Sequence, residues 1–130
     1  MPLHDKHFTR EEARRWLPEL RARFERARSL FGQLATLRQA YEAVQRKVRS
    51  NGHAVGCVDF EGPTEELRAL LADIADAGIQ IKDIARGLVD FPALRDGQEV
   101  YLCWKYGEED ILYWHEVDAG YAGRQPLDPE

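Results

Sequence analysis

The chain has 130 residues, of which 44% are hydrophobic and 32% charged, and its formal net charge is −5. This length predicts a single domain, 1–130, that can bury a core without disulfides or a structural metal. The apolar runs are too short to cross a bilayer, the first eight residues lack the apolar stretch of a secretory signal, and two cysteines do not make a disulfide framework. We therefore expect a cytoplasmic bacterial protein.

Charge is divided unevenly along the chain. Residues 10–50 hold eleven Lys and Arg against five Glu, whereas residues 51–130 hold six Lys and Arg against seventeen Asp and Glu. A basic half next to an acidic half favours docking within the chain, self-association in opposite orientation, or binding of the basic face to an acidic partner.

The first predicted helix begins at a capping box, in which Thr9 and Glu12 each accept a hydrogen bond from the backbone N–H of the other. Pro18 lacks a backbone donor, so we expect a kink or a restart near Leu17. Beyond it, apolar residues recur at helical steps of three and four as far as residues 51–52, whose Asn-Gly pair predicts the helix end. These apolar residues are Leu20, Phe24, Ala27, Phe31, Leu34, Leu37, Tyr41, Val44 and Val48.

A helix of roughly 32 residues is about 48 Å long, which exceeds the diameter of about 36 Å expected for a domain of this size. It must therefore protrude or bend, and Gly32 is the obvious weak point. A second copy of the chain would cover a protruding apolar seam and give a homodimer through the long helix. Alternatively, the seam packs on the chain's own second helix, predicted from Pro63 to Ala77 with Gly78 as its stop. The buried face of that helix is predicted to hold Leu67, Leu70, Leu71, Ile74 and Ala77, and the loop before it a short strand at 54–58.

From Gly78 onward the pattern changes to that of β-strands. Short strands are predicted around 79–81 and from Gly87 to Phe91, where Pro92 is expected to stop the strand. A turn at 95–98 leads into two longer strands, Gln98–Tyr106 and Glu109–Val117, around a hairpin turn at Gly107-Glu108. The predicted fold is therefore α+β: a long kinked helix and a second helix as a helical hairpin (9–77), a small antiparallel β-sheet (78–118) and a coil tail (119–130).

Four short motifs in the second half suggest a family. GIQIKD, GLVDFP, LCWKYGE and YWHE follow, in that order, a helix start that reads TREEA. From Phe8 to about Pro126, the chain resembles the bacterial family catalogued as domain of unknown function 2203. The resemblance implies no particular activity, but it matches the motif positions of Asp83, Asp90, Cys103, Trp104, Glu108, Trp114 and His115.

The candidate polar site lies on or near the C-terminal hairpin and consists of Asp83, Asp90, Trp104, Glu108, Trp114 and His115. Imidazole combined with carboxylates suits a divalent transition metal, and a thiolate favours zinc, so the metal candidates are His115, Asp90, Glu108 and Cys103. Asp90 lies in an apolar run, where a buried carboxylate needs a partner, and Lys82 and Arg86 are the expected ones. The competing interpretation is that His115 is a hydrogen-bonded structural histidine.

The register of the hairpin decides whether Cys103 and His115 meet. A two-residue turn at Gly107-Glu108 pairs Cys103 with Leu112 and puts His115 on the opposite face, beside Trp104. A three-residue loop shifts the pairing by one residue, so that Tyr101, Cys103, Tyr113 and His115 line one face. Glycine at the first turn position favours the two-residue turn, and with it the separation of Cys103 from His115.

These patterns favour a homo-oligomeric binding or assembly module with a polar site near the C-terminal β-hairpin. The first alternative is a metal-dependent enzyme that uses His115 and nearby carboxylates. The second is a protein that binds nucleic acid or another acidic partner through the basic long helix. The arginines of that helix are scattered around it, which favours a solvated face over a nucleic-acid site.

Overall fold

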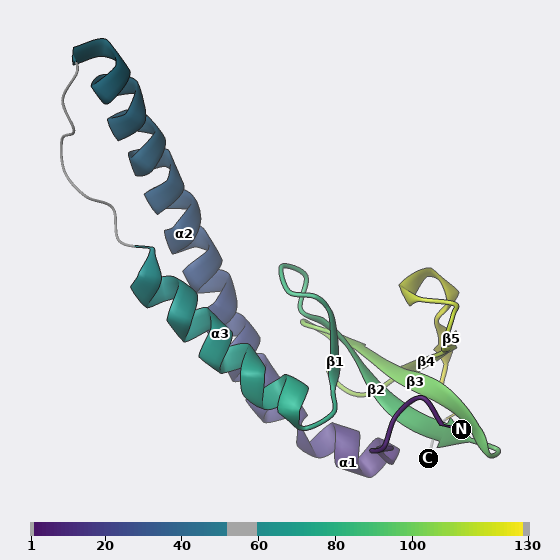
Figure 1. The fold of residues 1–130 in the computed structure, drawn as a ribbon. Helices are drawn as coiled ribbons and strands as arrows, with labels where there is room; N and C mark the ends of the chain where they lie inside the picture. The colour runs from purple at the N-terminus through teal and green to yellow at the C-terminus, as the bar shows by residue number, and fades with distance from the viewer. Residues whose placement is uncertain (1, 52–59, 129–130) are drawn as a thin grey trace.

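The computed structural model describes residues 2–51 and 60–128, which form a helical hairpin and a five-stranded sheet (Figure 1). The helices are α1 (Arg10–Arg15), α2 (Leu17–Asn51) and α3 (Glu61–Asp76), and a 3-10 turn, η1 (Tyr121–Gly123), precedes the last strand. The strands are β1 (Gln80–Asp83), β2 (Leu88–Arg95), β3 (Gln98–Lys105), β4 (Tyr113–Glu116) and β5 (Gln125–Pro126). The predicted α+β class, with a long broken helix, a second helix and an antiparallel sheet, is confirmed.

The helix start forms as its local chemistry predicts. The Thr9 hydroxyl accepts from the backbone N–H of Glu12, and the Glu12 carboxylate accepts from the N–H of Thr9, each at 3.1 Å. Helix α1 ends at Arg15 and α2 restarts at Leu17, because Pro18 has no N–H with which to continue the helical ladder.

Helix α2 has 35 residues and continues through Gly32, and its first half packs on α3. Arg23 joins the two helices, because it donates to the Leu70 carbonyl at 2.9 Å and pairs with Asp73 at 3.1 Å. Helix α2 extends past the start of α3 (Figure 1). Tyr41 of α2 is 45% exposed, and its ring centre lies 5.8 Å from that of Phe60, which precedes α3. The strand predicted at 54–58 lies outside the described residues. Within the described part of the chain, no helix is long and apolar enough to cross a membrane.

The sheet has the order β1-β2-β3-β4-β5, and every neighbouring pair is antiparallel. Asp96 (φ 52°) and Gly97 (φ 79°) make the tight turn predicted between β2 and β3. The prediction that Pro92 stops the strand is wrong, because β2 continues to Arg95. The backbone polar groups of Pro92 point away from β3, to the side of β2 that β1 leaves uncovered, and its carbonyl accepts there from the N–H of Phe8 at 2.7 Å. The N–H that proline lacks would therefore not have bonded to β3, and the hydrogen-bond ladder between β2 and β3 stays intact.

The C-terminal tail was predicted to be coil, but part of it returns to the sheet. Strand β5 pairs with β4, Tyr113 opposite Pro126 and Trp114 opposite Gln125, and the Leu127 N–H donates to the Leu112 carbonyl at 2.8 Å. This pairing covers the edge of β4, whose described extent is shorter than the predicted Glu109–Val117.

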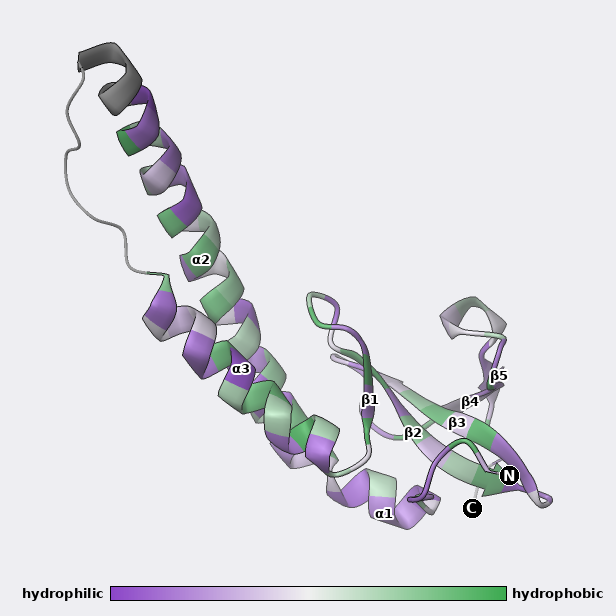
Figure 2. Ribbon diagram, in the orientation of Figure 1, coloured by the Kyte–Doolittle hydropathy of each residue, from purple (hydrophilic) through white to green (hydrophobic). Residues whose placement is uncertain are grey.

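The two faces of the sheet differ in chemistry, because successive side chains point to opposite sides. The face toward the helices is apolar and packs on Leu20, Phe24 and Ile74; it carries Val89, Phe91, Ala93, Val100, Leu102 and Trp104. Figure 2 shows the apolar residues of α2 and α3 where these helices run side by side. The opposite face carries Asp90, Tyr101, Cys103 and His115, all of them buried.

Candidate metal site

Strand register brings Cys103 and His115 to the same face. Strand β3 pairs Tyr101 with His115 and Cys103 with Tyr113. The register favoured from the sequence, with Cys103 opposite Leu112, is therefore wrong, and the alternative pairing holds. Its loop is longer than three residues, since the connection spans residues 106–112.

Contacts of the β3–β4 connection explain why a two-residue turn does not form. The Ile111 side chain is fully buried in the core, and Asp110 binds the Arg14 guanidinium at 2.8 Å. Both contacts pull the connection toward the helices, so Gly107 lies within a wide loop although its φ is 105°.

Asp90 joins this face from β2, where it pairs with Cys103. One possible ligand atom from each of Asp90, Cys103 and His115 lies within 4.8 Å of the other two. Their exposed fractions are 2%, 0% and 2%, so the three side chains, here named the Asp-Cys-His cluster, are closed to bulk water. The sequence predicted each of them as a metal candidate, and the structure brings these three together.

The partner of Asp90 is His115, whose Nε2 lies 3.0 Å from the Asp90 Oδ1. The predicted partners Lys82 and Arg86 are wrong, because both cations are engaged elsewhere. The Lys82 Nζ lies 5.0 Å from the ring centre of Tyr101, and the Arg86 guanidinium lies over the ring of Tyr121.

The two ring nitrogens of His115 have different partners. The Nδ1 lies 2.7 Å from the Glu116 carbonyl, which only accepts, so this nitrogen carries a hydrogen and donates. The Nε2 atom therefore faces Asp90. It carries a proton if the ring is charged, or a lone pair that can bind a cation if the ring is neutral. Burial lowers the pKa of His115, but the hydrogen bonds to Asp90 and to the Glu116 carbonyl, with the charge of Asp90, raise it overall.

The thiol of Cys103 is protonated in the metal-free protein. Burial, followed by the negative charge of Asp90, raises the pKa of Cys103 to about 12, although the Arg124 cation opposes the shift. A thiol with this pKa holds little thiolate near neutral pH, so it is a poor nucleophile as it stands. A bound metal changes this, because a coordinating thiol loses its proton.

Residues 6–127 match the family described as Uncharacterized conserved protein (DUF2203). The chain belongs to the DUF2203 family. The match covers almost the whole chain, and with it the Asp-Cys-His cluster and the C-terminal segment that returns to the sheet. Comparisons with curated proteins and with solved structures give no match.

The other residues predicted for the site lie outside the cluster. The Asp83 carboxylate accepts from the backbone N–H of Arg86 at 3.1 Å and stabilises the turn after β1. The Trp104 side chain is in the helix-facing core and donates to the Glu108 carbonyl at 3.0 Å. Trp114 also lies on that side of the sheet, with the Arg95 guanidinium 4.5 Å from its ring centre.

Glu108 lies beside the cluster and is held there by Arg124, at 2.9 Å. Sequence reasoning missed Arg124, because it placed residues 119–130 in coil. A signal was present, since Arg124 is the one Lys or Arg that follows Lys105 in an otherwise acidic and aromatic segment.

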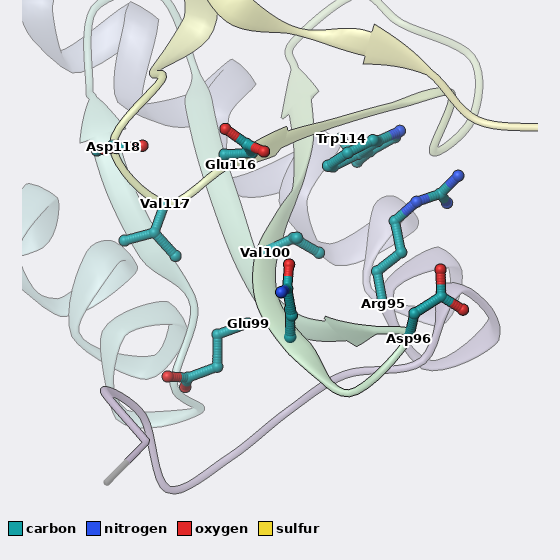
Figure 3. Close-up of a pocket in the computed structure, with 9 residues that line it drawn as sticks. Arg95, Asp96, Glu99, Val100, Trp114, Glu116, Val117 and Asp118 are labelled. Carbon is teal, nitrogen blue, oxygen red and sulfur yellow. The ribbon is translucent and has the colours of Figure 1, made fainter.

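A separate hollow of about 460 Å³ lies at the end of the sheet near the β2–β3 turn (Figure 3). Arg95, Glu99, Trp114 and Glu116 are among the residues that line it. Glu99 already binds the N-terminal segment, because it accepts from the backbone N–H of Leu3 at 2.7 Å. The hollow is open, its Glu116 is exposed and its Glu99 is already bound by the N-terminal segment, so the buried cluster is the stronger candidate site.

Proposed function

We propose that the chain is a small binding module whose ligand is a divalent transition metal, held by Asp90, Cys103 and His115. The observation that carries this proposal is the convergence of three donor atoms of different chemistry within 4.8 Å, at buried positions. Each donor comes from a different strand of one sheet, which fixes their separation more firmly than loops would.

The donor set favours zinc over other common ions. A thiolate and an imidazole suit Zn²⁺, whereas Mg²⁺ and Ca²⁺ take oxygen ligands. The second nitrogen of a metal-bound histidine usually donates to a carbonyl or carboxylate, and the Nδ1 of His115 already has such a partner in the Glu116 carbonyl. His115 is therefore oriented as a ligand before any metal arrives.

Charge also supports a cation at the cluster. A buried carboxylate and a buried thiolate are both costly to desolvate unless they are paired with positive charge. In the metal-free protein, a proton between His115 and Asp90 and a second proton on Cys103 supply that charge. A divalent ion would replace both protons and leave the cluster neutral.

Elemental analysis tests this proposal. Untagged protein, purified without chelators and then supplied with equimolar Zn²⁺, is expected to retain about one metal per chain. Cys103→Ser and His115→Ala are expected to lose it. His4→Ala is the matched control, because His4 binds the Tyr101 hydroxyl at 2.7 Å but is not one of the three donors. Wild-type protein that retains no metal, or equal retention in all four proteins, would refute the proposal.

A metal-dependent enzyme remains the first alternative and would use the same three residues. It requires, in addition, a coordination position that a substrate can reach. Cobalt-substituted protein distinguishes the two functions. A change in its visible spectrum on addition of azide would support an open position and favour the enzyme, whereas an unchanged spectrum favours a closed binding site.

We also propose that the module self-associates through α2. Leu34, Leu37, Tyr41 and Val44 follow the three-and-four spacing of a coiled-coil seam, and none of them is fully buried. The arginines of the first half of α2 are a weaker basis for binding an acidic partner, because Arg23 and Arg26 form ion pairs with α3.

A further inference from the structure

Arg124 is placed against the sulfur of the cluster by a set of specific contacts. Its Nη1 lies 4.0 Å from the Cys103 Sγ and 3.0 Å from the Glu108 Oε1. The guanidinium lies between two aromatic rings, 4.0 Å from the ring centre of Tyr113 and 4.3 Å from that of Tyr121. With 14% of its side chain exposed, Arg124 is largely removed from water.

Glu108 is itself fixed, which makes the position of Arg124 a rigid one. The Glu108 Oε1 accepts from the backbone N–H of Lys105 at 2.8 Å. The guanidinium plane is thus held by a tethered carboxylate and two rings, and one of its N–H groups is left beside the sulfur. An arginine stacks and donates in this way because its donors are fixed in a plane, whereas a lysine presents a compact charge.

The contact with sulfur is weak in the metal-free protein, because a neutral thiol is a poor acceptor. It becomes a charge-assisted hydrogen bond as soon as Cys103 is a thiolate. The arrangement is therefore better suited to the metal-bound form than to the metal-free form. Asp90 and His115 approach the sulfur from the neighbouring strands, while Arg124 approaches from the returning C-terminal segment.

We propose that Arg124 is a positioning residue of the metal site, which stabilises Cys103 as a thiolate ligand and so makes the site selective for thiophilic metals. This inference rests on the proposed metal-binding function. It assigns to the C-terminal segment a role in setting metal preference, in addition to covering the edge of β4. Residues that support metal ligands from outside typically contribute about 10- to 100-fold to metal affinity.

The alternative is that Arg124 only fastens the C-terminal segment to the β3–β4 connection through Glu108. That role would affect stability without altering the bond between the metal and sulfur. A spectroscopic readout of this bond separates the two, and Co²⁺ supplies one, because a thiolate bound to cobalt gives a charge-transfer band in the near ultraviolet.

The experiment titrates the full chain with Co²⁺ and then with Cd²⁺, and compares wild type with Arg124→Gln, Arg124→Lys and Arg86→Gln. Arg86 is the matched control, because its guanidinium lies 5.0 Å from the same Tyr121 ring and pairs with Asp83. Cys103→Ser identifies the thiolate band. Circular dichroism of each metal-free protein checks the fold, and Arg124→Met replaces Arg124→Gln if the latter does not fold.

We expect Arg124→Gln to bind Co²⁺ about 10- to 100-fold more weakly, with a reduced thiolate band and a smaller preference for Cd²⁺. Arg124→Lys should restore part of the band, and Arg86→Gln should match wild type. An unchanged affinity and band in Arg124→Gln, or tighter binding, would overturn the inference while metal binding itself stands. Wild-type protein that binds Co²⁺ without a thiolate band would also overturn the inference about Arg124. Wild-type protein that binds neither metal would overturn the proposed function as well.

Discussion

Removal of the Asp90 carboxylate is expected to destabilise the metal-free protein in a way that depends on the replacement. We predict that Asp90→Ala lowers the free energy of unfolding by about 3–5 kcal/mol, the range found when one partner of a buried ion pair is removed. We predict a smaller loss of about 1.5–3 kcal/mol for Asp90→Asn, the scale of a single hydrogen bond to a charged group.

The difference follows from the partners of His115. Its Nδ1 donates to the Glu116 carbonyl, and its Nε2 lies 3.0 Å from Asp90. With alanine, the Nε2 of His115 has no carboxylate to balance a proton on it and no hydrogen-bond partner. Water cannot replace that partner, because only 2% of His115 is exposed. Asparagine turns its amide N–H toward a neutral Nε2 and keeps one hydrogen bond. Because small domains have only about 5–15 kcal/mol of stability, the alanine variant should be close to unfolding.

Urea denaturation at pH 7 in the presence of a chelator measures both variants, with tryptophan fluorescence as the signal, since Trp104 lies in the core. The urea concentration at the midpoint of unfolding should fall in proportion to the lost free energy, while the dependence of that free energy on urea concentration stays constant. A double-mutant cycle with His115→Ala isolates the pair from the rest of the core. A loss below about 1 kcal/mol for Asp90→Ala, or equal losses for alanine and asparagine, would refute the reasoning, since an unsatisfied buried group costs about 1–3 kcal/mol.

Three further predictions concern other parts of the chain. Leu37→Asp in the outer half of α2 should convert a dimer to a monomer in sedimentation equilibrium, because a charge enters the apolar seam. In a Cys57→Ser background, Cys103 of the native metal-free protein should react with a thiol reagent at pH 8 far more slowly than it does in urea, because burial raises its pKa to about 12. The backbone N–H of Leu3 and the side chain of His7 lower the pKa of Glu99 to about 2. Attachment of the N-terminal segment through Glu99 should therefore be complete above pH 4.5 and lost as the pH falls toward 2. Limited proteolysis with an acid protease measures this loss.

Each of these predictions has a matched control. Gln39→Asp places the same charge on an exposed position of α2 and should leave a dimer intact, whereas a Leu37→Asp dimer would exclude this seam as the interface. Equal thiol reactivity in native and unfolded protein would contradict the burial argument for Cys103. Glu99→Gln should remove the pH dependence of N-terminal cleavage, and an unchanged dependence would assign it to another group.

Local signals in the chain fixed several of its helix boundaries, whereas α3 begins at Glu61 and not at the predicted Pro63. The Thr9–Glu12 capping box, the break at Pro18 and the glycine stop at Gly78 all form as predicted. The same holds for the tight turn at residues 96–97. Each depends on interactions between residues a few positions apart, so the local sequence contains all that is needed to specify it.

The candidate site was named from the sequence but assembled only by the tertiary structure. Asp90, Cys103 and His115 were all predicted as metal candidates, yet the favoured hairpin register would have separated Cys103 from His115. A shift of one residue moves a whole strand's side chains to the other face, and the shift is set here by the burial of Ile111. Neither the turn residues nor the strand pattern contains that information.

By itself, the sequence determined the fold class, the helix boundaries at Thr9, Pro18 and Gly78, the tight turn and the chemical inventory of the site, since these follow from local backbone preferences and periodicity. Only the tertiary structure decided that β2 runs through Pro92, that His115 is the partner of Asp90 and that Arg124 returns to Cys103. The physical reason is that these outcomes depend on contacts between distant residues, whose geometry is set by the packing of the sheet against the helices and by the return of the C-terminal segment.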